Sequence, residues 1–245
     1  MSALHVVMLG SSSANNFGLA AGEGTTDLLR THLQSVRSSH CRVTLLAQNG
    51  MGLTEQCPTG YSVPASLPAV NTSFNVTFAL ARRPDAVIIW QPAANMPEYQ
   101  QAPFSFTTVG QFENAIDTDM IPAMQAIQTA CVNQGVAFFC IGSHPSGAGA
   151  IPSNISVAQA TGRHYWDMRL AAVFGTSYID GGWNRYAVGS TYNNSTAEKA
   201  TPGTMDAGSD SHFTAATSSD FFTNIIVPRG FAELRDRRNA IDVVP

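Results

Sequence analysis

The sequence contains few charged residues, and its basic residues do not concentrate in any segment. Only 12% of the 245 residues are charged and the formal net charge is −4, whereas about 25% are charged in ordinary soluble domains. Proteins that bind nucleic acid or anionic membranes need a concentrated basic face, so we expect neither kind of partner. The surface should be polar but weakly charged, which leaves small neutral or sugar-like substrates open.

The sequence also lacks long apolar runs and the residue spacings typical of metal sites. No apolar stretch approaches the roughly 20 residues of a transmembrane helix, so we expect no membrane span. The histidines are scattered, and Cys41, Cys57, Cys131 and Cys140 show neither CxxC nor zinc-ligand spacing. We therefore expect no metal and no cofactor. Cys41 and Cys140 lie in apolar strand patterns, which favours buried thiols; a Cys41–Cys57 or Cys131–Cys140 disulfide stays open.

The first residues lead directly into an apolar strand pattern, with no signal-peptide pattern before it. Five N-x-Ser/Thr triplets favour a secreted protein whose signal has been removed over a cytoplasmic one, although a chain rich in Asn, Ser and Thr also forms such triplets by chance. They begin at Asn71, Asn75, Asn154, Asn193 and Asn194. The pattern does not indicate how many subunits the protein has.

Short apolar runs alternate with helical patterns along the chain. The runs predict strands over 5–10, 42–47, 86–90, 136–141 and 178–179, and helices over 26–36, 74–81, 111–133, 157–174 and from 214. This alternation predicts an α/β fold, a three-layer α/β/α sandwich with a mainly parallel, flavodoxin-like sheet. We expect one domain over 1–245, in which 229–245 is a charged tail or short helix. Functional loops should gather at the carboxyl ends of the strands.

Apolar spacing predicts which side of three of these helices packs against the sheet. In the longest helix, Pro122 must start or kink the chain, because proline lacks a backbone N–H. The expected inward-facing residues are Leu29, Leu33 and Val36; Phe74, Phe78 and Ala81; and Phe112, Ile116, Met120, Met124, Ile127 and Cys131.

Two segments far apart in the sequence carry residues suited to acyl transfer. The first strand delivers Ser11 and Ser12 onto a turn that begins at Gly10, and Asp210 and His212 lie in a short segment before the final helix. A serine hydroxyl needs a nearby base and hydrogen-bond donors for the developing oxyanion. This pairing suggests a hydrolase. The turn lacks the second glycine of a G-x-S-x-G elbow, so the sequence does not support an α/β-hydrolase.

The order of four sequence blocks resembles that of the SGNH/GDSL hydrolase superfamily, in particular its carbohydrate-esterase-like members. Gly10-Ser11-Ser12 matches the first block, Gly-Asp-Ser, with Ser in place of Asp, and Gly52-Leu53-Thr54 is similar to the second. The resemblance implies that Ser12 is the nucleophile and that the backbone N–H groups of Ser12 and Gly52 are oxyanion donors. Gly50 is the alternative to Gly52.

The third and fourth blocks are similar to the family pattern with small departures. The segment after the third strand resembles a variant with Pro in place of Gly; it implies Asn95 as a side-chain oxyanion donor, although Ala94 occupies the expected position. His212 resembles the histidine of Asp-x-x-His and would be the general base. Asp210 stands two residues before it instead of three, so Asp210, Asp206 or a backbone carbonyl could orient the imidazole.

The resemblance implies a serine esterase that hydrolyses short acyl esters, with acetyl esters of carbohydrate as the first choice of substrate. His144 and Trp183 are candidate substrate contacts, although a loop histidine is the simpler explanation of His144. Trp90 and Trp166 fit a core. The alternatives are a lysophospholipase or thioesterase of the same superfamily, and a non-catalytic α/β domain that binds phosphate, flavin or glycan.

Overall fold

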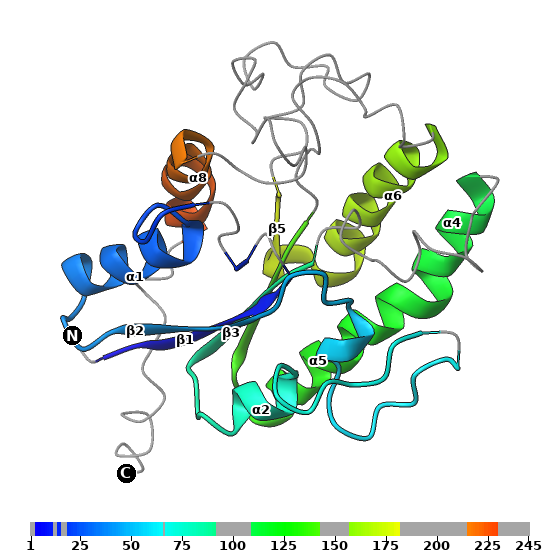
Figure 1. Cartoon of the computed structure of the whole chain (residues 1–245), viewed down its shortest axis with the longest axis horizontal. Helices are drawn as coiled ribbons and strands as arrows, with labels where there is room; N and C mark the ends of the chain where they lie inside the picture. Colours follow the sequence, from blue (N-terminus) through cyan, green and yellow to red (C-terminus); the bar gives the residue numbers. More distant parts are fainter. Residues whose placement is uncertain are drawn as a thin grey trace.

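The computed structural model describes residues 3–11, 14–15, 19–65, 67–91, 109–142, 157–181 and 215–229. Within these residues, five strands form one sheet in the order β2-β1-β3-β4-β5, and every neighbouring pair is parallel (Figure 1). The strands are β1 (His5–Gly10), β2 (Arg42–Ala47), β3 (Ala86–Trp90), β4 (Ala137–Ile141) and β5 (Tyr178–Ile179). The predicted parallel sheet is confirmed, and each strand lies within one residue of its predicted range.

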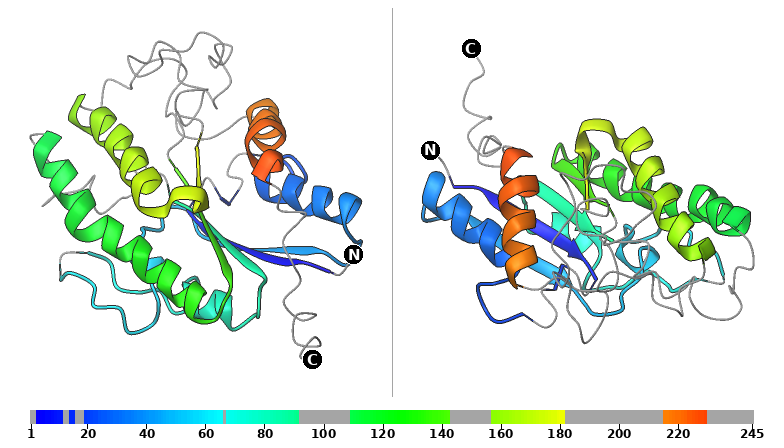
Figure 2. Two further views of the ribbon diagram at one scale, coloured as in Figure 1. Left: turned by 180° about the vertical axis from the view of Figure 1, so that it is seen from behind. Right: turned by 90° about the horizontal axis from the view of Figure 1, so that it is seen from above.

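Helices cover both faces of this sheet, as Figures 1 and 2 show. One face carries α1 (Thr25–Val36) and α8 (Ala215–Phe221), which is followed by a π-type turn at Phe222–Ile226 and a 3₁₀ turn at Val227–Arg229. The other face carries α2 (Val76–Leu80), α5 (Ile121–Asn133) and α6 (Val157–Phe174). A 3₁₀ turn, η1 (Thr54–Gln56), follows β2, and another, at Gly175–Ser177, precedes β5. The predicted three-layer sandwich is confirmed.

The central strands are buried on both faces because their side chains alternate between two cores. In β1, Val7 and Leu9 belong to the core under α2, α5 and α6, whereas Val6 and Met8 belong to the core under α1 and α8. Every residue of β1 and β3 is buried. Near-continuous apolar runs are typical of parallel strands covered by helices on both sides, which explains why the strands could be predicted from the sequence.

The longest predicted helix is one helical segment with a local irregularity. It runs from α4 (Val109–Ala115) through a π-type turn at Ile116–Met120 into α5, and Pro122 lies in the first turn of α5. Pro122 is expected to start or kink the helix, and the structure has a π-type turn immediately before the helix α5 that contains it. The expected inward-facing residues that are described here are buried: Ile116, Met120, Met124, Ile127 and Cys131.

Two predicted helix faces are partly wrong. In α2, Val76, Ala79 and Leu80 are buried. Ala81, just after the helix, is exposed, and Phe78 is 38% exposed with its ring under the Arg82 guanidinium. The reason is the cap at Asn75, whose side-chain oxygen accepts a hydrogen bond from the Phe78 N–H at 2.8 Å and so fixes where this short helix begins.

Val36 is likewise exposed, because the chain leaves α1 at this residue, whereas Leu29 and Leu33 are buried as predicted. Asn75, which begins one of the N-x-Ser/Thr triplets, is buried as the N-cap of α2. Its role as a cap therefore explains this asparagine, and the triplet is no argument for a glycan.

Candidate active site

The loops that follow β2, β1 and β3 lie at one edge of the sheet. The three strands are adjacent and parallel, and the pairing places Gly10 beside Ala47 on one side and beside Trp90 on the other. The chain leaves β1 toward α1 on one face and leaves β3 toward α5 on the opposite face. Such a switch point, at the carboxyl ends of the strands, is where α/β sheets bind ligands.

Gly10 ends β1 at a position that has no room for a side chain. A Cβ atom there would lie 2.5 Å from the Trp90 carbonyl oxygen and 2.6 Å from the Ala14 Cβ. The chain turns back at once, since the Asn15 N–H donates to the Ser11 carbonyl at 3.0 Å, and Ser11 is fully buried. The glycine of the first block is therefore required by the close approach of two backbone segments.

The loop after β2 contains both glycines that the sequence offered as oxyanion donors, and the structure distinguishes them. Gly50 is exposed, has φ +76°, and lies in a turn closed by the Met51 N–H donating to the Gln48 carbonyl at 3.2 Å. A positive φ of this kind favours glycine in a tight turn. Gly52 is buried. Gly50 thus has a turn role of its own, and Gly52 is the glycine that faces the interior.

Side-chain hydrogen bonds connect this loop to the loops after β1 and β3. The Asn15 Nδ2 donates to Asn49 Oδ1 at 2.9 Å, which joins the β1 and β2 loops. On the other side, Gln91, the first residue after β3, donates from Nε2 to the Met51 carbonyl at 3.2 Å. The three loops are therefore held in one arrangement by direct contacts.

Gly52 is bonded at both of its backbone polar atoms. Its N–H donates to Glu55 Oε2 at 2.7 Å, and its carbonyl accepts from Gln56 Nε2 at 3.0 Å. Gln56 Nε2 also donates to Gln91 Oε1 at 2.8 Å, and both glutamines are fully buried. We call Gln56, Gln91 and the backbone of Met51 and Gly52 the amide cluster. Buried networks of this kind fix a single geometry when their members are bonded.

Two tryptophans pack around the end of β3. Trp166 from α6 donates from Nε1 to the Gln91 carbonyl at 3.2 Å, and Trp90 stacks on Phe221 of α8 with ring centroids 5.2 Å apart. Trp90 and Trp166 are both buried, so their predicted place in the core is confirmed. Through Phe221, the helix that follows the segment with Asp210 and His212 is anchored on β3.

Most of the predicted site residues lie outside the described residues: Ser12, Asn95, His144, Trp183, Asp210 and His212. They stay predictions, as does the oxyanion role of Gly52. Sequence reasoning missed Glu55, Gln56 and Gln91. One signal was present in the sequence: Gln91 is an uncharged polar residue directly after a wholly apolar strand, where a buried amide needs partners.

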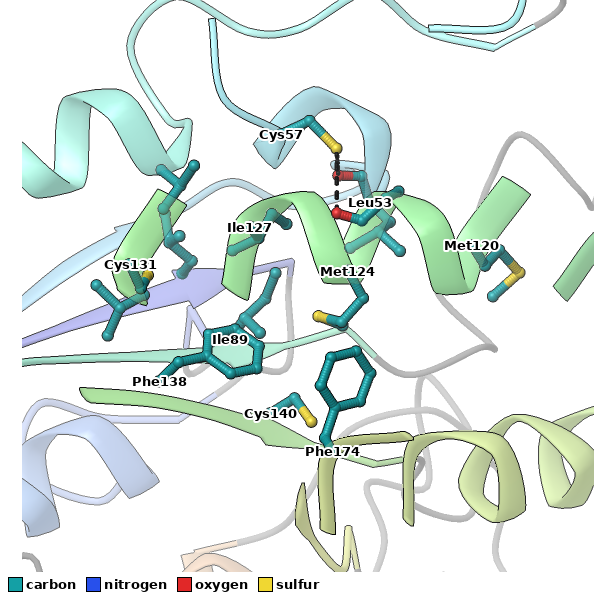
Figure 3. Close-up of a cluster of buried hydrophobic side chains, with 14 of the residues drawn as sticks. Leu53, Cys57, Ile89, Met120, Met124, Ile127, Cys131, Phe138, Cys140 and Phe174 are labelled. Carbon is teal, nitrogen blue, oxygen red and sulfur yellow. Dashed lines mark hydrogen bonds between the residues drawn. The ribbon is translucent and has the colours of Figure 1, made fainter. Parts of the chain in front are cut away.

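The cysteines offer no competing nucleophile. All four lie in the described part of the chain, where each is a free, buried thiol, so neither disulfide that the sequence left open is present. Burial raises the pKa of the Cys57 and Cys131 thiols to about 12, and it raises the pKa of Cys140 as well. Figure 3 shows Cys57 with its Sγ directed at the carbonyl groups of Leu53 and Ala123, 3.8 and 3.7 Å away. These three thiols are uncharged at neutral pH and therefore weak nucleophiles.

The described part of the chain contains neither a metal-binding group nor a membrane-spanning helix. Its His, Cys, Asp and Glu residues form no group of three that could hold a metal ion. Its helices include none that is both long and apolar enough to cross a membrane.

Comparison with known proteins shows which solved structures share this fold. No protein-family model and no curated protein matches the sequence. Among solved structures, an acetyl xylan esterase aligns with a TM-score of 0.58 and 13% identity, over 90% of this chain and 96% of its own. An acetyl-xylooligosaccharide esterase from Geobacillus, in variant form, aligns with a TM-score of 0.56 and 9% identity, over 96% and 98%.

A lipolytic protein assigned to the G-D-S-L family, from Desulfitobacterium hafniense DCB-2, aligns with a TM-score of 0.55 and 10% identity, over 89% of this chain and 95% of its own. These identities are low, so the likeness is one of fold. The chain therefore shares its fold with these two acetyl esterases and with the lipolytic protein of the G-D-S-L family.

Proposed function

We propose that this protein is a serine esterase of the SGNH type. Ser12 attacks the ester carbonyl while His212 takes its proton, and His212 then gives this proton to the departing alcohol as the ester C–O bond breaks. Water next attacks the acyl-enzyme with His212 again as the base, which releases the acid and restores Ser12. The observation that carries the proposal is the meeting of two sequence blocks at adjacent strand ends: Gly10 closes β1, and Gly52 lies in the neighbouring loop. This arrangement occurs within a fold that the chain shares with esterases.

The oxyanion of the tetrahedral intermediate would be stabilised by the N–H groups of Ser12 and Gly52 and by the Asn95 side chain. In this structure the Gly52 N–H donates to the Glu55 carboxylate, so the oxyanion would take the place of that carboxylate. His212 would be oriented by Asp210, by Asp206 or by a backbone carbonyl.

The proposed substrate is a short acyl ester, with an acetyl ester of carbohydrate as the first choice. Two of the similar structures are acetyl esterases of xylan or xylooligosaccharide. The weakly charged sequence agrees with a neutral substrate. His144 and Trp183 would contact the sugar, Trp183 by stacking on a ring.

The test is hydrolysis of p-nitrophenyl acetate by the wild type, by Ser12→Ala and by the neighbouring control Ser13→Ala, with folding checked by circular dichroism. We expect Ser12→Ala to lower kcat by at least about 10³-fold, whereas Ser13→Ala keeps most of it. A fluorophosphonate should label Ser12 in the wild type. The proposal is wrong if hydrolysis survives both Ser12→Ala and His212→Ala. Release of acetate from acetylated xylooligosaccharides then tests the substrate class.

A further inference from the structure

The peptide unit between Met51 and Gly52 is held at both of its polar atoms. The Met51 carbonyl accepts from Gln91 Nε2 at 3.2 Å, and the Gly52 N–H donates to Glu55 Oε2 at 2.7 Å. In a trans peptide the carbonyl and the N–H are rigidly coupled and point to opposite sides. A side chain that holds the Met51 carbonyl therefore also sets the direction of the Gly52 N–H.

Gln91 is itself held in one orientation by Gln56. Gln56 Nε2 donates both to Gln91 Oε1 at 2.8 Å and to the Gly52 carbonyl at 3.0 Å. Both partners are acceptors, so the Gln56 amide cannot turn over without losing two hydrogen bonds. Gln56 Oε1 has no hydrogen-bond partner among the described residues. The orientation of the Gln56 amide therefore depends on the two bonds from Nε2.

The amide cluster therefore holds the two peptide units on either side of the Gly52 Cα. Gln91 holds the unit before it and Gln56 holds the unit after it, and a direct bond joins the two glutamines. Trp166 fixes the backbone of Gln91 through the Gln91 carbonyl at 3.2 Å. Because Gln56 and Gln91 are fully buried, water cannot replace a bond that is lost.

We propose that Gln91, oriented by Gln56, is a positioning residue that fixes the direction of the Gly52 N–H, which bonds Glu55 Oε2 in the free protein and would bond the developing oxyanion in its place. This inference rests on the proposed esterase function. Gln91 acts through the Met51–Gly52 peptide and does not itself contact the substrate. An oxyanion donor acts mainly in the transition state, so its misalignment lowers kcat more than it changes KM.

The first test compares Gln91→Met with Gln34→Met, using p-nitrophenyl acetate as substrate. Gln34 is the control for the loss of one amide–carbonyl bond, since its Nε2 donates to the backbone carbonyl of Cys41 at 2.9 Å. It is exposed and lies beside the amino end of β2, away from the candidate site. We expect Gln91→Met to lower kcat at least about tenfold, with KM changed less than about threefold. Gln34→Met should keep kcat within about twofold of the wild type.

The second test uses Gln91→Glu, which has nearly the same shape. When protonated, its carboxyl group can accept from Gln56 and donate to the Met51 carbonyl, as the amide does; when ionised, it cannot donate and repels that carbonyl. Burial raises the pKa of such a carboxyl. The ratio of its kcat to the wild-type kcat should therefore rise as the pH falls from about 9 to about 6. A side chain that only fills space would show a constant ratio.

The outcomes separate this inference from the proposed function. If the wild type is inactive, or if its activity survives Ser12→Ala, the esterase proposal fails and this inference fails with it. If the wild type depends on Ser12 but folded Gln91→Met keeps its kcat, the positioning role alone is overturned. If Gln91→Met does not fold, Gln91→Glu decides: a ratio independent of pH overturns the role.

Discussion

The amide cluster and a second polar cluster on the protein surface join distant segments in similar ways, but in opposite environments. The second, which we call the Asp117 cluster, consists of Asp117, Tyr165 and Arg169. Asp117 accepts from the Tyr165 hydroxyl at 2.8 Å and from Arg169 Nε at 2.6 Å, which ties the π-type turn before α5 to α6. Its charged side chains are 34% and 39% exposed, whereas both glutamines of the amide cluster are fully buried.

Burial decides what each cluster can do. At the surface, water replaces a broken hydrogen bond and screens the charges, so an exposed ion pair contributes about 0–1 kcal/mol. In the interior, removing one partner leaves the other unbonded, at a cost of about 1–3 kcal/mol. The Asp117 cluster is therefore a tether between helices, whereas the amide cluster can hold a backbone donor in one direction.

Replacing Gln56 with leucine tests the buried amide cluster, for which we expect the larger loss of stability. Gln56→Leu keeps a side chain of similar size but leaves the Gly52 carbonyl and Gln91 Oε1 without their donor. We expect the free energy of unfolding to fall by about 3 kcal/mol, measured by urea unfolding.

The control is Gln34→Leu, which removes a single bond to the Cys41 carbonyl at an exposed position. It should cost about 1 kcal/mol. Equal losses for the two variants would show that burial does not separate the amide cluster from other glutamines.

Glu55→Gln changes the side chain that accepts a hydrogen bond from the Gly52 N–H in the free protein. The carboxylate occupies the proposed oxyanion donor and would repel an oxyanion, whereas an amide oxygen binds the N–H more weakly. We expect this substitution to lower the activation free energy by about 1 kcal/mol, which corresponds to a rise in kcat of about fivefold. Hydrolysis of p-nitrophenyl acetate measures it.

Glu23→Gln is the control for this experiment, because Glu23 Oε2 also accepts a backbone N–H three residues earlier, that of Ala20, at 3.0 Å. It lies in the exposed turn before α1 and should leave kcat unchanged. A lower kcat for Glu55→Gln would contradict the view that Glu55 competes with the oxyanion.

The smallest effect is expected at the Asp117 cluster. Desolvation raises the pKa of Asp117, but the hydrogen bonds from Arg169 and Tyr165 and the charge of Arg169 lower it by more, so the net shift is downward. A carboxyl whose pKa is lowered by folding stabilises the protein above its unfolded pKa, about 3.9, and loses this effect as the pH falls through the folded value.

Asp117→Asn should therefore cost less than about 1 kcal/mol at neutral pH, and its difference from the wild type should shrink below about pH 3.5. Urea unfolding at both pH values measures this. A loss as large as that of Gln56→Leu would break the distinction between the two clusters.

The fold could be predicted from the sequence because its strongest signal is local. Every strand of the described sheet is a short apolar run, and helical spacing lies between most of them. The errors occur where a single contact overrides the pattern. Phe78 has the spacing of a core residue, yet the cap at Asn75 and the Arg82 guanidinium place it at the surface.

The candidate site was only partly predictable for the opposite reason. Gly10 and Gly52 follow strands and belong to short blocks, so local sequence indicates them. The link between Gln56 and Gln91 spans 35 residues, and neither glutamine has neighbours that predict its partner. Such a contact depends on the strand order, since it forms only when the loops after β2 and β3 come to the same edge of the sheet.

The strand order has a consequence for synthesis on the ribosome. β1 is made first, β2 joins one side of it, and β3, β4 and β5 then add in turn on the other, so each new strand meets a partner that already exists. Gly10, Gly52 and Gln91 are all made well before the proposed base, His212. A nascent chain would therefore hold its proposed nucleophile without the group that activates it until residue 212 has been made.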